Sequence, residues 1–326
     1  MANADNALLR IESGQQSYPM DELLNTGDNR TFEGIAAPWS GRGGFEPNVR
    51  PDGLITGGAI TAGAGNNSIN IAALTCYLAG DQVAVAGSTG VSVTRAEATD
   101  THIIHSITVS DAGVIAVVSG TDSTSFSETR GVAGGPPLIP VGSIEIGQVR
   151  LSSATAGPVT NAEIYQVVGL HQERYDFPTF QTQNFTGEVV FDADIPAIHT
   201  GSEPKGVYAS YATPIFAEVP RASDVVVPEE AFSVSSEAYY GGSLGSVSRS
   251  LNQGTFRVLT ENGITDSVVR LKGETLWFEF LPNRFRNSEK LMYQGILGVT
   301  RSFPAEGAMA ADCTVSASNA ASEVSA

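Results

Sequence analysis

Lysine, cysteine and histidine are scarce in this chain of 326 residues. The only lysines are Lys205, Lys272 and Lys290, so arginine carries almost all of the positive charge. The formal net charge of -17 argues against a protein that grips nucleic acid, because phosphate binding depends on lysine and arginine replacing condensed counterions. The same sign suits a surface that nucleic acid passes without adhering, although acidity also simply keeps an abundant protein in solution.

The two cysteines, Cys76 and Cys313, lie far apart and form no CxxC motif, so we expect buried free thiols and no metal site or disulfide framework. The first 30 residues are acidic and have no long apolar run, which predicts that there is no secretory signal. Nowhere does the sequence reach the roughly 18 consecutive apolar residues that cross a bilayer. These absences predict synthesis and folding in a cytoplasm, without a membrane partner.

No catalytic, cofactor or metal constellation is evident. Residues 241–245 match G-x-S-x-G, which presents the serine of some hydrolases, here Ser243. That turn requires a strand before it, a helix after it and a histidine later in the chain. All four histidines precede Ser243, so we expect no enzyme. The glycines near residue 60 lack the GxGxxG spacing and a following Lys-Ser/Thr, so no phosphate cradle is predicted.

Two further groups resemble ligand sets only superficially. His102 and His105 are three positions apart in a strand-like run, which points them to opposite faces, so we expect hydrogen-bonded strand histidines. Asp192 and Asp194 share a strand face and would suit a hard cation, but no third acidic ligand is close in sequence. A solvated strand edge that discourages pairing is the favoured interpretation. The sequence therefore predicts neither a metal nor a cofactor.

The composition favours an all-β fold, a β-sandwich or barrel with one or two short helices. Good helix formers are few, glycine is frequent at 35 residues, and only 16% of residues are charged. We expect two β domains between two terminal segments. Their predicted ranges are 1–51 for an N-terminal arm or linker, 52–172 for a β-rich outer or decorating domain, 173–315 for a second β domain, and 316–326 for a flexible tail.

Within the first β domain, apolar runs of strand length recur about every ten residues between Gly/Ser/Asp/Asn turns, which is typical of a sandwich or barrel. The predicted strands are 68–78, 82–86, 91–94, 101–110, 114–119 and 143–151, of which 101–110 and 114–119 form a hairpin. A capped helical turn is expected at 160–168.

The N-terminal segment is polar, with one helical turn predicted at residues 20–24. Residues 38–51 are rich in proline and glycine and form an extended linker in this interpretation. In an assembly such a linker lies across a neighbouring subunit, with Trp39 and Phe45 as anchors. A simple surface coil explains the composition equally well.

The second β domain opens with predicted strands at 185–191 and 207–217, the latter interrupted at Pro214. Residues 238–253 are low in apolar content, which predicts a long loop or hairpin tip that becomes ordered only against a partner subunit.

The densest strand signals lie in residues 276–317. An aromatic strand at 276–280 ends at Pro282, and a polar loop then leads to an apolar run at 291–301. Gly295 and Gly298 inside this run indicate a bulge or a close backbone approach. After a break at 303–307, residues 308–317 alternate apolar and polar side chains like a half-buried strand. A short helix is predicted upstream, within 260–273, with Thr265 or Asp266 as its cap and Gly273 as its stop.

This order of a short helix, an aromatic strand, a polar loop, a glycine-bearing strand, a Ser-Phe-Pro break and a final alternating strand resembles the C-terminal half of tail tube proteins of tailed, siphophage-like bacteriophages. The resemblance covers residues 255–317 and, more loosely, 180–254. It is a pattern of strands without an invariant chemical motif. The residues that carry it are 276–282, 293–298, 299–304 and 309–317.

The resemblance implies a β-sandwich that polymerises through its own copies. Rings of six copies, or of three copies forming a pseudo-hexamer, would stack into a tube inside the virion tail, with other tail proteins at its ends. DNA would pass through the lumen without specific binding, and assembly would take place in the host cytoplasm. The chain is longer than the minimal family pattern, and we expect residues 52–157 to be an added outer domain because they do not align with the C-terminal pattern.

Six residues are the predicted subunit contacts. Arg284 and Arg286 share one side of the polar loop and Phe285 takes the other; planar arginine forks suit carboxylates of a neighbour, although an ordinary exposed basic loop is equally consistent. Phe303 either seats the chain against a neighbour or occupies a buried turn. Trp39 and Phe45 complete the set.

A different class of function also fits the sequence. A virion surface module, such as a fibre or a capsid decoration protein that binds a host glycan or receptor, would explain the β-rich region 52–157. Rings or tubes in electron microscopy would favour the tail tube, and compact trimers or monomers would favour the surface module.

Overall fold

The computed structural model describes residues 6–325 and is built almost entirely of β-strands, which confirms the all-β class. Its helical elements are α1 (Ser267–Arg270) and the 3-10 turn η2 (Asn161–Glu163). The chain divides into two compact units. Unit 1 comprises Met1–Ser17, Trp39–Glu46 and Ala212–Ala326, and unit 2 comprises Tyr18–Pro38 and Pro47–Tyr211. Among residues 6–325, no helix has the length and apolarity to cross a membrane.

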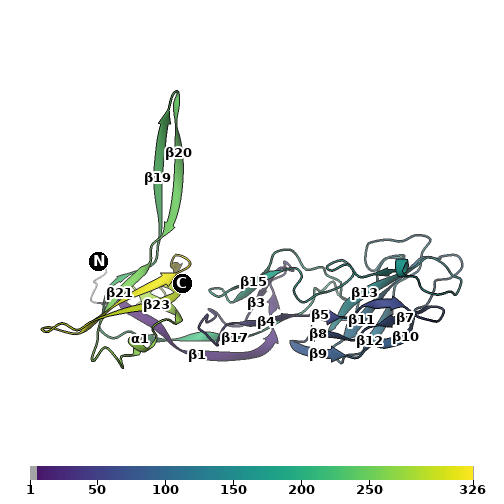
Figure 1. The fold of residues 1–326 in the computed structure, drawn as a ribbon, viewed down its shortest axis with the longest axis horizontal. Helices are drawn as coiled ribbons and strands as arrows, with labels where there is room; N and C mark the ends of the chain where they lie inside the picture. The colour runs from purple at the N-terminus through teal and green to yellow at the C-terminus, as the bar shows by residue number, and fades with distance from the viewer. Residues whose placement is uncertain (1–5, 326) are drawn as a thin grey trace. The chain divides into compact units, whose positions relative to one another are not determined.

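One nine-stranded sheet dominates unit 1 (Figure 1). Two of its strands, β1 and β17, continue into unit 2, where β17 pairs with β4. The sheet order is β18 (Ala222–Val226), β21 (Gly254–Leu259), β24 (Ala310–Ala317), β23 (Lys290–Ser302), β22 (Thr275–Leu281), β1 (Leu8–Glu22), β17 (Val207–Glu218) and β4 (Asn48–Pro51), with β25 (Ser322–Val324) paired to β23.

The N-terminal segment differs from its sequence-based description. Residues 8–22 form the long strand β1, which pairs with β22 from Leu8 opposite Leu281 to Ile11 opposite Phe278. The helical turn expected at residues 20–24 is wrong, because that stretch belongs to β1 and to the short strand β2 (Leu24–Asn25). The boundaries of the two units differ from the predicted domain boundaries, because residues 1–17 and 39–46 of the N-terminal segment belong to unit 1.

The C-terminal strand pattern matches the expectation closely. The aromatic run forms β22, the polar loop connects it to β23, and the last alternating stretch forms β24 with every second residue buried. Phe278 on β22 stacks on Tyr293 of β23 with ring centroids 5.2 Å apart, and both side chains are buried. These rings fill the centre of the unit 1 core.

Gly295 and Gly298 of β23 allow the neighbouring strand β24 to approach closely. A Cβ atom at Gly295 would lie 2.6 Å from Val315 Cγ1 and 2.8 Å from the Ser316 carbonyl oxygen. A Cβ atom at Gly298 would lie 2.4 Å from Thr314 Oγ1. Of the two sequence-based alternatives, the close approach is therefore the one realised.

The predicted helix before β22 is reduced to the single turn of α1. Asp266 stands at its N-cap position. Its carboxylate accepts hydrogen bonds from the backbone N–H groups of Glu261 and Gly263, both at 2.8 Å. These hydrogen bonds lower the pKa of Asp266. Gly273 follows with a φ of 85°, as expected of a helix stop.

Unit 2 consists of four small antiparallel sheets. β11 and β12 form the predicted hairpin, with His105 opposite Ser119 and Val109 opposite Ile115. The sheets are β10 (Ser88–Ser92), β7 (Ser68–Ile71) and β6 (Ile60–Ala62); β12 (Ile115–Ser119), β11 (Ile103–Ser110), β13 (Ser143–Leu151) and β14 (Ile164–Tyr165); β15 (Phe180–Gln183), β16 (Glu188–Phe191), β3 (Thr31–Glu33) and β2; and β5 (Gly53–Gly57), β8 (Leu74–Leu78) and β9 (Asp81–Val85).

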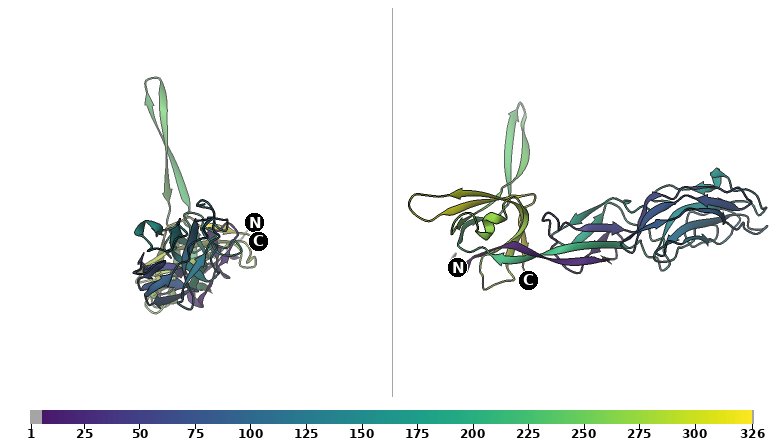
Figure 2. Two further views of the ribbon diagram at one scale, coloured as in Figure 1. Left: turned by 90° about the vertical axis from the view of Figure 1, so that its right-hand side faces the viewer. Right: turned by 60° about the horizontal axis from the view of Figure 1, so that its bottom comes forward.

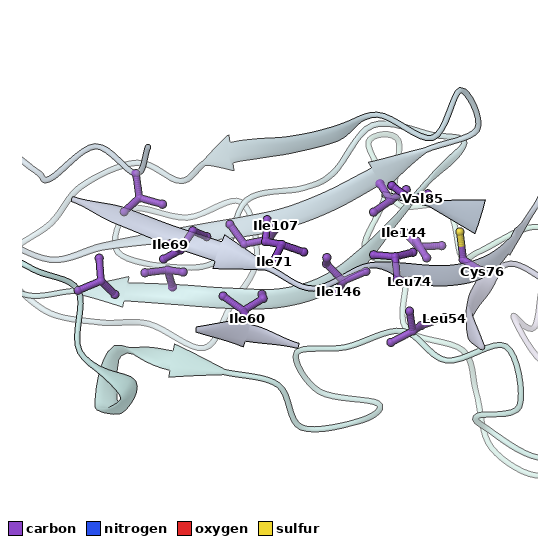
Figure 3. Close-up of a cluster of buried hydrophobic side chains, with 14 of the residues drawn as sticks. Leu54, Ile60, Ile69, Ile71, Leu74, Cys76, Val85, Ile107, Ile144 and Ile146 are labelled. Carbon is purple, nitrogen blue, oxygen red and sulfur yellow. The ribbon is translucent and has the colours of Figure 1, made fainter. Parts of the chain in front are cut away.

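Isoleucine and leucine side chains from these strands form the core of unit 2, shown in Figure 3. Ile69, Ile107 and Ile144 are completely buried there. The free thiol of Cys76 lies in this core and that of Cys313 in the core of unit 1, as expected.

Three local expectations need correction or refinement. The predicted strand at 68–78 is two strands, β7 and β8, which belong to different sheets. The strand at 207–217 is not interrupted at Pro214, because β17 runs through it. The capped turn near residue 160 is present as η2, where the Thr160 N–H donates to the Glu163 carboxylate at 2.7 Å.

Gly295 tests the close packing of β23 on β24. We expect Gly295→Ala to destabilise unit 1 by about 1–3 kcal/mol, because its Cβ cannot be accommodated without moving strand backbone. Urea unfolding followed by tryptophan fluorescence measures this, since both tryptophans, Trp39 and Trp277, lie in unit 1. Gly43→Ala is the matched control, because nothing lies within 4 Å of its added Cβ. Equal midpoints for the two variants would contradict the packing argument.

Asp52 gives unit 2 a pH-dependent stability. Burial raises its pKa to about 7, although its carboxylate accepts the Ala79 N–H at 2.9 Å. A raised pKa means that the folded state favours the protonated carboxyl, so this contribution is fully present below the unfolded pKa and is lost as the pH rises through 7. We expect the urea concentration at the midpoint of unfolding, followed by far-UV circular dichroism, to decrease as the pH is raised from about 4 to about 7. Asp52→Asn should flatten that fall; an unchanged slope would refute the assignment.

Candidate assembly surface

The hairpin of β19 (Glu230–Tyr239) and β20 (Gly242–Leu251) forms a two-stranded sheet of its own within unit 1. Its strands pair along their whole length, from Glu230 opposite Leu251 to Tyr239 opposite Gly242. The two strands run side by side in all views of Figures 1 and 2. Sequence analysis predicted a long loop or hairpin tip from residue 238 onward, and the hairpin in fact begins at residue 230.

Three apolar side chains are exposed on one face of the hairpin. Phe232, Val234 and Val247 lie on it because residues two apart on a strand share a face and Val234 pairs with Val247. Their exposed fractions are 65%, 75% and 68%. An exposed apolar cluster of this kind makes the face a candidate interaction site.

The opposite face carries a row of serines. Ser233 Oγ lies 2.6 Å from Ser248 Oγ, and Ser235 Oγ lies 2.7 Å from Ser246 Oγ. In each pair, one serine hydroxyl donates a hydrogen bond to the other across the strands. The serine face is therefore polar and suited to contact with water, whereas exposing the apolar side chains of the other face to water is unfavourable.

The end of the hairpin carries large side chains that are mostly exposed. Tyr239 and Leu244 are 64% and 70% exposed, and Tyr240 in the turn is fully exposed. An isolated two-stranded hairpin is marginally stable in water. We name the exposed side chains of residues 230–251 the hairpin surface; a covering partner would stabilise it.

The predicted arginine loop lies between β22 and β23 and remains exposed. Arg284 Nη2 is 3.4 Å from Glu218 Oε1, and Arg286 Nη1 is 3.3 Å from Glu289 Oε1. Both arginines thus pair with carboxylates of their own chain. Phe285 between them is 79% exposed.

The other three predicted contact residues have different environments. Trp39 is completely buried in unit 1, where its carbonyl oxygen accepts the Trp277 Nε1–H at 2.7 Å, so it offers no exposed side chain to a neighbour. Phe45 is only partly exposed. Phe303 is exposed at the turn after β23 and packs on Gly263. Among the described side chains, no hydrogen bond or ion pair joins the arginine loop, Phe303 and the hairpin surface to one another.

The residues considered above as candidate catalytic groups or metal ligands lie in the following environments. The side chain of Ser243 lies outside the described part of the structure; its backbone belongs to β20, in a strand-turn-strand hairpin. His105 is hydrogen-bonded to Ser119 Oγ at 3.1 Å and to the Thr94 carbonyl at 2.6 Å. Asp192 accepts a hydrogen bond from Thr179 Oγ1 at 2.6 Å. The described residues contain no group of three or more His, Cys, Asp or Glu suited to a metal ion.

Sequence analysis missed the apolar side chains of the hairpin surface. The signal was present, because Phe232 and Val234 alternate with serines and Val247 stands between Ser246 and Ser248. Alternation of this kind predicts a strand with one face covered. It was overlooked because the surrounding stretch is rich in serine and glycine, which favours a loop.

Removing the apolar face should leave the isolated subunit intact. We expect Val234→Thr combined with Val247→Thr to change the free energy of unfolding of unit 1 by less than about 0.5 kcal/mol, because both side chains are solvated. Leu297→Ala, at a completely buried position of β23, should cost about 2–5 kcal/mol in the same urea experiment. A large loss in the hairpin variant would show that its face is covered within the subunit.

No model of a known protein family and no curated protein sequence matches this chain.

Proposed function

We propose that this chain is the major tail tube subunit of a tailed bacteriophage, a structural protein without enzymatic activity. Copies would form rings that stack around a DNA-conducting channel. The sequence resemblance supplies the hypothesis, and the hairpin surface is the observation that carries it. The hairpin pairs ten residues on each strand and exposes the apolar side chains of Phe232, Val234, Leu244 and Val247 to solvent, which a covering surface would remove from water.

Another copy of the chain is the partner that the proposal assigns to this surface. A hairpin that lies on a different patch of the next copy makes a head-to-tail contact, and such contacts generate closed rings or open filaments depending on the rotation between copies. The free edges of β19 and β20 also suit strand addition by a neighbour. Both properties are those of a polymerising subunit.

The arginine loop can exchange partners at little cost. The ion pairs of Arg284 and Arg286 are exposed on both sides, and exposed pairs contribute about 0.2–1 kcal/mol. The chain has 35 acidic residues against 18 lysines and arginines, so a neighbouring copy offers alternative carboxylates. We therefore keep these arginines, with Phe285 and Phe303, as subunit contacts in the proposal.

Charge supports the proposed role of the lumen. At a net charge of -17, a ring of copies repels DNA phosphates, and the genome would pass without specific binding. The subunit would assemble in the host cytoplasm, reside in the virion tail and meet other tail proteins at the ends of the tube.

Shortening the hairpin tests the proposal. Replacing residues 236–245 by Asn-Gly joins Ser235 to Ser246, which are already paired, through a two-residue turn. We expect negative-stain electron microscopy to show rings or tubes for the full chain and none for the shortened variant. The tryptophan fluorescence spectrum should stay unchanged, since Trp39 and Trp277 are buried elsewhere in unit 1.

A matched control removes exposed apolar side chains from unit 2. Val114→Ser with Val141→Ser alters residues that are 58% and 61% exposed and should leave the tubes unaffected. Tubes formed by the shortened variant would refute the role of the hairpin. A full chain that stays monomeric or forms compact trimers at every concentration would refute the tail tube and favour a virion surface module.

A further inference from the structure

Unit 2 contains a cavity of about 600 Å³ beside β13. This volume lies within the range of about 300–1,000 Å³ that is usual for small-molecule sites. Strand β14 and the chain segments around residues 128–136, 169–178 and 195–198 complete its wall. All of the lining residues belong to unit 2.

One wall of the cavity is a row of polar side chains on β13. Gln148 Nε2 donates to Glu145 Oε1 at 3.1 Å, and Arg150 Nη2 donates to Gln148 Oε1 at 3.1 Å. The exposed fractions of Glu145, Gln148 and Arg150 are 1%, 1% and 9%. Burying such groups costs free energy that an apolar strand would avoid, so the row calls for an explanation other than stability.

The charges around the cavity are already paired. Arg130 forms an ion pair with Glu145, and Arg150 donates to both carboxylate oxygens of Glu128 at 2.6 and 2.9 Å. Lys205 donates to the carbonyl oxygens of Arg174 and Phe177 at 2.6 and 2.9 Å. Burial lowers the pKa of Lys205 to about 8, and the charge of Glu173 partly offsets this effect.

Three acidic side chains, Glu128, Glu145 and Glu173, and three basic ones, Arg130, Arg150 and Lys205, therefore line the cavity, and their formal charges cancel. An ionic ligand would add a charge without a counterion, which is costly where it is shielded from water. A neutral ligand avoids that cost. It can still use the alternating donors and acceptors of the guanidinium, amide and carboxylate groups.

His171 provides a hydrogen-bond donor that lacks an acceptor. Its Nε2 lies 3.2 Å from Arg150 Nη2. Because a guanidinium can only donate, Nε2 is the acceptor of this contact, which shares the two Nη2 hydrogens with Glu128 and Gln148, and Nδ1 of the neutral ring then carries the proton. Burial and the Arg150 charge lower the pKa of His171, which keeps the ring neutral at pH 7. Nδ1 has no hydrogen-bond partner among the described residues, and the residue is only 5% exposed.

The lining also contains apolar side chains. Leu170 and Phe177 are 61% and 46% exposed, although both line the cavity. Further apolar lining comes from Pro178, Ile195, Pro196 and Ile198. The cavity thus offers both hydrogen-bonding groups and apolar surface suited to C–H groups.

We propose that this cavity binds a neutral saccharide of one or two pyranose rings. Ring hydroxyls both donate and accept, which matches the alternating groups of Gln148 and Arg150 and supplies an acceptor oxygen for His171 Nδ1. The C–H face of the ring packs against Leu170 and Phe177. The inference rests on unit 2 alone and does not depend on tube formation.

Saturation-transfer NMR on the full chain tests it with D-glucose, D-galactose, D-mannose, N-acetyl-D-glucosamine, lactose and cellobiose as probes. At least one should bind with a Kd of about 1 mM or tighter. Ala197→Trp, at a partly buried lining position, should weaken binding about tenfold or more by filling the cavity. Val141→Trp, 61% exposed and not among the lining residues, should leave the affinity unchanged.

An anionic ligand is distinguished by titrating the unchanged full chain with D-glucuronate and with inorganic phosphate. Neither anion should bind, because the Arg150 guanidinium already donates to both carboxylate oxygens of Glu128. Binding of either anion in place of neutral sugars, binding that Ala197→Trp does not affect, or no binding by any of the six probes would each overturn the proposal. None of these outcomes bears on the electron-microscopy test of tube formation.

Discussion

Unit 1 depends on the buried carboxyl group of Glu12. Its Oε2 accepts the backbone N–H of Trp277 at 3.1 Å, and its Oε1 accepts Ser40 Oγ at 2.5 Å and Gln15 Nε2 at 2.9 Å. The Trp277 indole donates in turn to the Trp39 carbonyl oxygen at 2.7 Å. A carboxyl group with no exposed surface would cost several kcal/mol without such donors. This network therefore joins three segments that are distant in sequence, around Glu12, Trp39 and Trp277.

The hairpin contributes nothing to that network. Its apolar side chains are solvated, whereas the core of unit 1 is closed by Phe278, Tyr293 and Leu297. A fold whose stability is secured elsewhere can retain an apolar surface that the folded monomer does not need. Under the proposed function such a surface is retained for a partner, so the hairpin is a stronger candidate contact than the arginine loop. The arginines already have carboxylate partners in their own chain.

Local pattern was enough to predict the strands that carry clear alternation, but not those defined by distant partners. The aromatic run before Pro282 and the alternating last strand were recognisable without knowledge of their neighbours. β1 was missed because its second half, residues 13–22, is polar, and only pairing with β22 and β17 makes it a strand. Trp39 stands among prolines and glycines that favour a surface coil, yet its burial depends on Trp277.

The saccharide cavity was invisible to sequence analysis for the same reason. Glu128, Glu145 and His171 carry no motif, and their side chains come together only when separate loops close over β13. The two candidate sites follow from a single physical rule, that a folded chain satisfies its polar groups and covers its apolar ones. On the hairpin surface, apolar side chains remain exposed to water, and a second protein surface is the kind of partner that would cover them. In the cavity the rule is broken by a donor without an acceptor, at His171 Nδ1, which calls for an oxygen-bearing small molecule. The kind of group left unsatisfied therefore determines the kind of partner that each unit is expected to bind.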